Sequence, residues 1–241
     1  MVTDGRTPAS PANVDGREID KFAAAAAFWW DRHGAYKALH DINPLRLDYI
    51  ESHAGLRGSN VIDVGCGGGL LSEGMARRGA TVTGIDAGAS PLAAARSHLA
   101  VSGLSVDYQR ATAEEMAARH PAGFNLVTCL ELLEHVPDPA STVRACSALA
   151  RPGGHVVFAT LNRNPKSYLF AIVAAEYILR FVPRGTHSYR RFIRPAELTA
   201  WAESSGLVRL DLTGLHYNPF RRRYSLGGNH HVNYLMDFIK R

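Results

Sequence analysis

Cysteine is scarce in this sequence. Cys66, Cys129 and Cys146 are the only three in 241 residues, and no two of them form a Cys-x-x-Cys pair. An odd, widely spaced set cannot supply a disulfide framework and is a poor set of zinc ligands. We therefore expect three reduced thiols that serve in packing. No apolar segment typical of a signal peptide follows the first residue, so we expect the protein to stay inside the cell.

Extremes of composition are also missing. Hydrophobic residues make up 46% of the chain and charged residues 20%, which is ordinary for a folded domain and excludes a disordered one. The length suits one α/β domain, so we expect residues 1–241 to form a single domain. Only residues 1–16, which mix Pro, Ser, Gly and Asp without periodic apolar positions, are expected to be flexible.

What the sequence does contain is a regular alternation of strand-like and helix-like segments. Two helices are expected within 17–58, separated by a break at Asn43-Pro44, and later helices over 70–80, 90–103 (opened by Ser90), 112–120, 139–154 (closed by Pro152-Gly153-Gly154) and 195–206. Strands are expected over 60–64, 81–86, 106–111, 124–130, 155–161, 207–217 and 232–240. This alternation predicts the α/β class, with a seven-stranded, mostly parallel, Rossmann-like sheet covered on both faces by helices.

Three glycines, Gly65, Gly67 and Gly69, lie between the first strand and the helix that follows it. Their backbone amides and the N-terminus of the helix can face a ligand with no Cβ in the way. Asp86 ends the next strand, 21 residues after Gly65. In a parallel sheet its carboxylate would lie beside the glycine turn and could accept hydrogen bonds from both hydroxyls of a ribose. The sequence therefore predicts a cofactor that contains adenosine.

The glycine spacing separates two cofactor classes. A dinucleotide site has the pattern G-x-G-x-x-G, in which the amides meet a pyrophosphate. This chain instead has Asp63-x-Gly65-x-Gly67-x-Gly69, which resembles the S-adenosylmethionine-dependent methyltransferases. Asp63 would repel a pyrophosphate but can receive the ammonium of an amino acid. The pattern favours S-adenosylmethionine over a nicotinamide cofactor.

The end of the fourth strand indicates the kind of substrate. It lacks the Asn/Asp-Pro-Pro-aromatic motif of enzymes that methylate amino groups of nucleic acids, so we expect no nucleic-acid partner.

The end of the fourth strand instead carries Glu131, Glu134 and His135, whose spacing puts them on one face of a helical turn. Such a set can bind Mg²⁺ or another hard cation. A metal, or His135 as a base beside Glu131, would ionise a phenol, whose pKa is about 10. Alternatively, the glutamates are solvated or cap neighbouring groups.

Several longer blocks carry a more specific resemblance. The sequence is similar to the ubiquinone biosynthesis O-methyltransferases, also called 3-demethylubiquinol 3-O-methyltransferases, over nearly everything from Val14 to Asp237. The blocks that carry it are NPLRLDYI, DVGCGGGLLSEGMARRGATVTGID, TCLELLEHVPDP, ATLNRN, EYILRFVPRGTH and TGLHYNPF. The general methyltransferase motifs account only for the glycine block, and the later blocks are particular to this family.

The resemblance implies O-methylation of two prenylated phenols, an early 2-polyprenyl-6-hydroxyphenol and the late 3-demethylubiquinol. By position it implies cofactor contacts at Arg46, Gly65, Asp86 and Leu130. Arg46 can hold the methionine carboxylate, and Leu130 can flank the adenine. Asp63 and Gly67 join this set from the fold class, and Glu131, Glu134 and His135 match the magnesium positions of related members.

A basic segment over 163–194 contains seven Lys or Arg and one acid, Glu176. Its central part, between Pro165 and Pro183, has 17 residues, fewer than the roughly 20 that a membrane span needs. As a helix it would be amphipathic, with a basic side and an apolar side. We expect 165–194 to lie on an anionic membrane surface, which makes the protein a peripheral protein of the cytoplasmic membrane. The alternative is a substrate lid, and both roles are compatible.

Other readings of the sequence remain. The same fold could methylate a soluble catechol or phenol, with the basic helix acting only as a lid. The glycine spacing disfavours a nicotinamide dehydrogenase. Asp86 together with the Glu-His cluster disfavours a non-catalytic cofactor-binding protein. Association with other ubiquinone-biosynthesis enzymes stays open.

Overall fold

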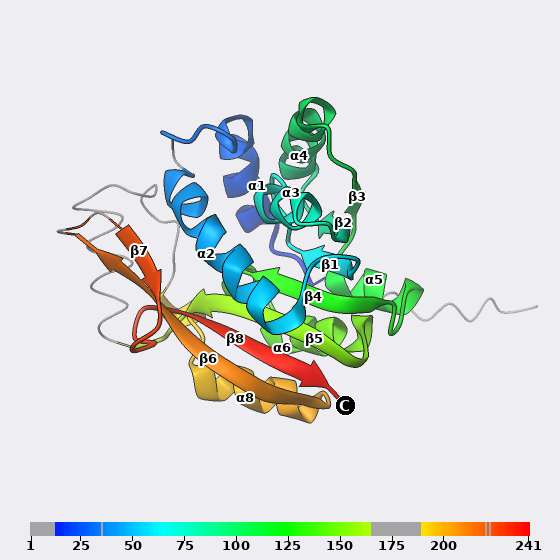
Figure 1. Ribbon diagram of the computed structural model, residues 1–241, viewed down its shortest axis with the longest axis vertical. Helices are drawn as coiled ribbons and strands as arrows, with labels where there is room; N and C mark the ends of the chain where they lie inside the picture. Colours follow the sequence, from blue (N-terminus) through cyan, green and yellow to red (C-terminus); the bar gives the residue numbers. More distant parts are fainter. Residues whose placement is uncertain (1–12, 35, 165–188, 220, 222) are drawn as a thin grey trace, which may run out of the picture.

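The computed structural model describes residues 13–34, 36–164, 189–219, 221 and 223–241. Within them, one sheet carries helices on both faces (Figure 1). Its strands are β1 Asn60–Val64, β2 Thr81–Asp86, β3 Val106–Arg110, β4 Phe124–Leu130, β5 Ala150–Leu161, β6 Leu207–Asn218, β7 Arg223–Leu226 and β8 Asn233–Lys240. The α-helices are α1 Gly16–Ala25, α2 Lys37–Ala54, α3 Leu70–Arg77, α4 Ala89–Ser102, α5 Ala113–Arg119, α6 Pro139–Leu149 and α8 Pro195–Ser204. Short 3₁₀ helices are η1 Ala26–Phe28, η2 Leu133–His135 and η4 Tyr189–Arg191.

The strand order is β3-β2-β1-β4-β5-β8-β6-β7. The first five strands in this order are parallel. Strand β8 runs antiparallel to both of its neighbours, and β7 forms an antiparallel edge against β6. The predicted α/β class is therefore confirmed. The order reverses between β1 and β4, and in such a sheet this reversal opens a crevice at the carboxyl ends of the strands.

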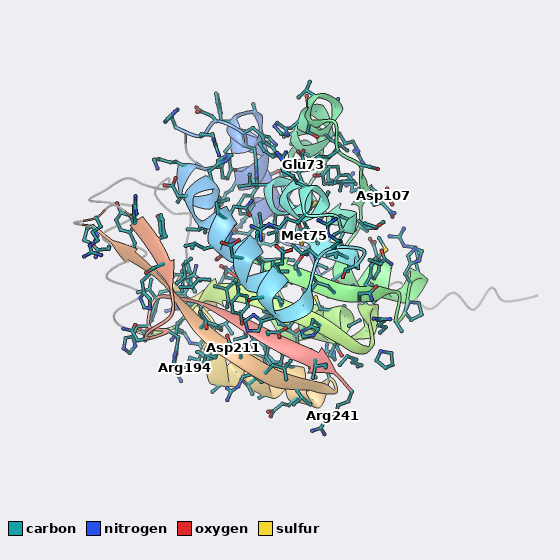
Figure 2. All side chains as sticks on the ribbon, viewed as in Figure 1. Glu73, Met75, Asp107, Arg194, Asp211 and Arg241 are labelled. Atoms are coloured by element: carbon teal, nitrogen blue, oxygen red, sulfur yellow. The ribbon has the colours of Figure 1, made fainter. Side chains whose placement is uncertain are left out.

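Two hydrophobic clusters fill the two faces of the sheet. Val61 of β1 packs with α2, α3 and α4, while the next residue, Ile62, packs with α5, α6 and α8. This follows from the alternation of side chains along a strand. Met75 of α3 is fully buried in the first cluster (Figure 2). Because strands buried on both faces hold their positions firmly, their carboxyl ends form a rigid platform for a site.

The predicted break at Asn43-Pro44 is wrong, because α2 continues through Pro44. A proline inside a helix removes the hydrogen bond to the carbonyl four residues earlier, here that of His40. Ile42 and Leu47, on either side of Pro44, are buried in the same cluster, and this packing outweighs the local penalty. The chain leaves the first helical segment at Phe28 instead.

Two helix boundaries differ from prediction. Helix α4 begins at Ala89 after Gly88, rather than being opened by Ser90. Helix α6 ends at Leu149, and Pro152-Gly153-Gly154 belong to β5 instead of closing the helix. The reason is that Ala150 already has extended backbone angles and pairs with Phe124 of β4.

Strand β7 was missed in the prediction. It is a four-residue strand that begins with Arg223, the last of three arginines that follow Pro219 in a loop-like stretch of sequence. Short, charged strands are common at sheet edges because they discourage pairing with other chains. Pairing with β6, rather than any pattern of its own, makes this segment a strand.

Residues 13–16, predicted to be part of a flexible terminus, make defined contacts. The Asn13 side-chain amide donates to Glu114 and to Thr142, at 3.0 Å in each case. Asp15 caps α1 by accepting from the Arg17 amide at 3.0 Å. Residues 1–12 lie outside the described residues, and so do 165–188, the main part of the predicted basic insertion.

None of the helices in the described part of the chain has the length and apolar character needed to cross a bilayer. The three cysteines are buried and unpaired, as predicted.

A buried polar pair joins β5 and β8. Asp237 is fully buried, and both of its carboxylate oxygens lie 3.0 Å from Nδ1 of His155. This hydrogen bond raises the pKa of His155, against the opposing effect of burial. The protonated imidazole therefore stabilises the pairing of the two strands.

We expect His155→Ala to lower the free energy of unfolding by about 2 kcal/mol at pH 6, because it leaves a buried carboxylate without this donor. The folded pKa of His155 lies above its ordinary value of 6.5. Its contribution is therefore complete below that value and is lost as the pH rises through the folded pKa. Urea denaturation of both proteins from pH 6 to 9 should show the difference narrowing. A difference that stays constant with pH would contradict this role.

Candidate active site

The turn after β1 is anchored to the end of β2. The backbone amides of Gly65 and Cys66 donate to the carbonyl of Ile85 at 2.8 and 2.9 Å. Gly65, Gly67 and Gly69 have φ angles of +74°, +54° and +85°, which residues with a side chain rarely adopt. The three glycines therefore permit the sharp passage from β1 into α3.

The carboxylate of Asp86 faces this turn. One oxygen accepts from the Gly67 amide at 3.0 Å and the other from the Gly88 amide at 2.7 Å. Burial raises the pKa of Asp86, and the two amide bonds oppose that rise. The structure thus brings the predicted acidic partner to the glycine turn, where both lie on the wall of one cavity.

Asp63, in β1, lines the same cavity and is almost fully buried. Its carboxylate accepts from the hydroxyl of Ser72 at 2.6 Å and from that of Thr128 at 2.8 Å. Burial raises the pKa of Asp63 to about 6, although both hydroxyls favour the ionised form. Asp63 therefore changes charge close to neutral pH.

Arg46 and Glu131 form a partly buried ion pair between α2 and the end of β4. Glu131 has a φ of +54°, so it lies outside the helical turn that was predicted for residues 131–135. Its backbone amide donates to Ala159 of β5 at 2.8 Å. The same Glu131 carboxylate accepts from the side-chain amide of Asn233, at the start of β8, at 3.0 Å.

Glu134 lies in η2 and is also buried. One oxygen accepts from the Thr160 hydroxyl at 2.7 Å, and the other has no hydrogen-bond partner among the described residues. Burial raises the pKa of Glu134 well above its usual range, and the nearby charge of Glu131 adds to this effect. The site thus contains two neighbouring carboxyl groups with different environments.

His135, the last residue of η2, pairs with a residue that the sequence patterns did not single out. Its Nδ1 lies 2.9 Å from the carboxylate of Glu18 in α1. Because a carboxylate accepts, this contact favours the proton on Nδ1 and leaves Nε2 as the acceptor nitrogen of a neutral ring. Burial opposes ionisation of Glu18, but hydrogen bonds from Lys21 and His135 outweigh it and lower its pKa. Phe22 packs edge-on against the imidazole at 5.1 Å.

The three predicted metal ligands do not converge. Glu131 faces Arg46, Glu134 faces Thr160 and His135 faces Glu18. In the part of the chain that the structure describes, no three His, Cys, Asp or Glu side chains form a group that could hold a metal ion. This arrangement does not fit a cation, because each side chain is directed to its own protein partner.

A cavity of about 1260 Å³ runs from the glycine turn to Glu131, Glu134 and His135. This exceeds the usual size of a pocket for one small ligand, so it has room for two. Leu130, which was predicted to flank an adenine, lines it together with Arg46, Asp63 and Asp86. Much of the remaining wall is apolar: Ile19, Phe22, Leu39, Ile42, Leu71, Leu132, Val136, Leu161, Leu215 and Val232.

The segment between α1 and α2 is docked against the glycine turn. A Cβ placed on Gly67 would come within 2.3 Å of the Trp29 ring. The Trp30 indole donates to the Gly68 carbonyl at 2.9 Å and stacks on His98 at 3.3 Å. His98 in turn contacts Glu73 of α3 at 2.9 Å. Trp29 lines the cavity, so the N-terminal segment closes one side of it.

Comparison with known proteins agrees with this arrangement. A family model described as a methyltransferase domain matches residues 30–212. A ubiquinone biosynthesis O-methyltransferase of Stutzerimonas stutzeri is 57% identical over 95% of this chain and 99% of its own. One from Sodalis glossinidius is 60% identical over 93% of this chain and 90% of its own.

Solved structures with low sequence identity share the fold. The magnesium protoporphyrin IX methyltransferase of Synechocystis, with S-adenosylhomocysteine bound, superposes with a TM-score of 0.65 at 15% identity, covering 92% of this chain and 98% of its own. A methyltransferase of Thermotoga maritima gives a TM-score of 0.67 at 14% identity, over 93% and 99% of the two chains. From these matches, the glycine turn and the sheet order, this chain is an S-adenosylmethionine-dependent methyltransferase that belongs to the ubiquinone biosynthesis O-methyltransferase family.

Proposed function

We propose that this protein transfers a methyl group from S-adenosylmethionine to a phenolic hydroxyl of prenylated catechols and quinols, of the 3-demethylubiquinol and 2-polyprenyl-6-hydroxyphenol type. The observation that carries the proposal is the single cavity that joins the glycine turn to Glu131, Glu134 and His135. A methyl donor and an aromatic acceptor need such a shared space because the transfer is direct. The extended apolar wall suits the first part of a prenyl tail.

The cofactor roles follow from chemistry and position. Asp86 would accept from the ribose hydroxyls, and Gly65 and Gly67 would let the backbone approach the nucleoside. Leu130 would pack on the adenine. Asp63 and Arg46 lie on the same wall and offer opposite charges, which suits the ammonium and the carboxylate of the methionine part. Bound in this way, S-adenosylmethionine supplies a sulfonium-activated methyl group.

The protein's own contribution to the reaction is positioning and removal of a proton. We propose His135 as the base, with Nε2 taking the proton of the phenol while Glu18 holds the ring through Nδ1. The Glu131 carboxylate, which lines the same cavity, would favour the protonated imidazole electrostatically. The phenolate oxygen would then be the nucleophile for the methyl carbon, and the carbon–sulfur bond of the sulfonium would break to leave a neutral thioether.

A role for Mg²⁺ at Glu131, Glu134 and His135 stays a prediction. It would require these side chains to leave Arg46, Thr160 and Glu18. A cation there would lower the pKa of a bound phenol, whereas His135 as a base would remove the proton without a cation.

We also propose that the protein works at the cytoplasmic face of the inner membrane through 165–194, because a prenylated substrate is held in the bilayer. Within the described part of this segment, Arg191 pairs with Asp15 at 2.7 Å, and Arg163 just before it pairs with Glu197. These contacts tie both ends of the segment to the domain. The central part of the segment, 165–188, lies outside the described residues. Contact with other enzymes of ubiquinone biosynthesis is a further proposal.

The methyl-transfer assay tests the main proposal. With labelled S-adenosylmethionine, the wild-type protein should methylate a short-chain demethylubiquinol. Asp86→Ala should weaken S-adenosylhomocysteine binding by about 10- to 100-fold, because two hydroxyl contacts to a buried carboxylate are lost. Equal methylation of a plain soluble catechol would contradict the prenylated substrate class. Activity that is unaffected by EDTA would exclude the metal.

The charge of Asp63 predicts a pH dependence of cofactor affinity. A bound ammonium favours ionised Asp63, whose pKa in the free protein is about 6. The affinity for S-adenosylhomocysteine should therefore fall as the pH drops through 6, by up to about tenfold per pH unit. Calorimetric titration at pH 5, 6 and 7.5 measures this. Asp63→Asn should bind more weakly at pH 7.5 and show a flatter profile, whereas parallel profiles would remove Asp63 from the ammonium site.

Cosedimentation with anionic vesicles tests the membrane role. We expect binding at low salt that weakens at high salt, because electrostatic attraction to the lipids is screened. Neutral vesicles serve as the control. A protein that stays in the supernatant with anionic vesicles at low salt would contradict the proposal.

A further inference from the structure

Asn13 is hydrogen-bonded through both polar atoms of its side chain. Its Nδ2 donates to Oε1 of Glu114 and to Oγ1 of Thr142, at 3.0 Å in each case. Asp138 binds both ends of the side-chain amide, because its carbonyl accepts from Nδ2 at 2.8 Å and its backbone amide donates to Oδ1 at 2.8 Å. These bonds hold the residue against the first turns of α5 and α6.

Asn13 and Glu18 connect the same two parts of the chain. Asn13 binds Asp138, which caps the start of α6. Glu18, in the first turn of α1, lies 2.9 Å from Nδ1 of His135 at the end of η2. The first link uses no group that is assigned to the reaction, whereas the second orients the proposed base.

Packing does little to fix the start of α1. None of the residues of this helix is buried, and its apolar side chains Ile19 and Phe22 line the cavity. The buried residues of the N-terminal segment come later, at Ala26 and Trp29. The position of Glu18 therefore depends on the polar contacts at the start of the helix.

Two sets of polar contacts lie at that start. Arg191 pairs with Asp15 at 2.7 Å and with Glu18 at 3.6 Å, but its side chain is 39% exposed. Exposed ion pairs contribute little to stability because water screens them. The bonds from Asn13 are better shielded, since Thr142 is buried. Asn13 is thus the stronger anchor.

We infer that Asn13 is a positioning residue for methyl transfer, which fixes the start of α1 so that Glu18 meets Nδ1 of His135. This inference rests on the proposed function, in which His135 removes the phenol proton through Nε2. A base must lie within hydrogen-bond reach of the proton that it takes, so a small displacement of the group that orients it lowers the rate. Asn13 takes no part in the proton transfer and acts through Glu18.

The test is a double-mutant cycle on kcat with Asn13→Ala and Glu18→Ala, using labelled S-adenosylmethionine and a saturating short-chain demethylubiquinol. Asn13→Ala alone should lower kcat by about tenfold, within the range that misplacement of a catalytic group produces. Glu18→Ala alone should lower kcat at least as much. In the Glu18→Ala background, Asn13→Ala should cause no further loss, because the contact that it positions is already absent.

The cycle separates positioning from a general loosening of the domain. If Asn13 only stabilised the fold or the cavity wall, its loss would lower kcat by the same factor with and without Glu18. Equal factors in the two backgrounds, or an unchanged kcat in Asn13→Ala, would overturn the inference. The affinity of each variant for S-adenosylhomocysteine should match that of the wild-type protein, which shows that the variant is folded.

Asn60→Ala is the matched control. The side-chain amide of Asn60 also joins two distant segments, by donating to the Gly123 carbonyl at 2.9 Å. Asn60 begins β1, at the end of the strand away from the glycine turn. This variant should keep the wild-type kcat, and a loss equal to that of Asn13→Ala would count against the inference. Failure of the proposed function would appear separately, as absence of methyl transfer by the wild-type protein or as an unchanged kcat in Glu18→Ala.

Discussion

The hydrogen bond from the Gly67 amide to the Asp86 carboxylate joins the ends of two parallel strands, and the rest of the site is built around it. It exists because parallel strands end at the same edge of the sheet. It also requires a glycine, since Gly67 has a positive φ and lies against the Trp29 ring. A side chain at this position would both strain the turn and displace the tryptophan. One backbone contact therefore depends on the strand order, the turn and the N-terminal segment together.

A second constraint is the concentration of charge in a buried place. Arg46, Glu131 and Glu134 all line the cavity, and Arg46 and Glu134 are buried while Glu131 is partly buried. The ion pair of Arg46 with Glu131 limits the cost of this burial, whereas Glu134 responds by a raised pKa. Within the described residues, the four side chains that carry a buried polar atom without a hydrogen-bond partner all line the cavity. Buried polar atoms without partners are typical of a site whose ligand completes the hydrogen bonding.

The N-terminal segment, which comprises α1 and the residues before α2, closes one side of the cavity. Glu18 reaches His135 from α1, and Trp30 is held by the Gly68 carbonyl and by stacking on His98. Short contacts therefore connect the N-terminal segment both to the glycine turn and to the proposed base, His135. A shift of α1 would change the orientation of the imidazole as well as the enclosure of the cavity.

The sequence alone determined the α/β class, the seven strands that it predicted and the grouping of Gly65, Gly67 and Asp86, because each depends on local periodicity and on a spacing within one β-α-β unit. It missed β7 and placed a break at Pro44, since partner strands and packing decide such segments. The spacing of Glu131, Glu134 and His135 predicted a shared face, but Glu131 has a positive φ and each of the three side chains is directed to a different partner. Glu18 and Asn233 lie 117 and 102 residues from their partners His135 and Glu131, so no local pattern could identify them. Only the tertiary structure decided these contacts, because the direction of a side chain across the cavity depends on packing between distant segments.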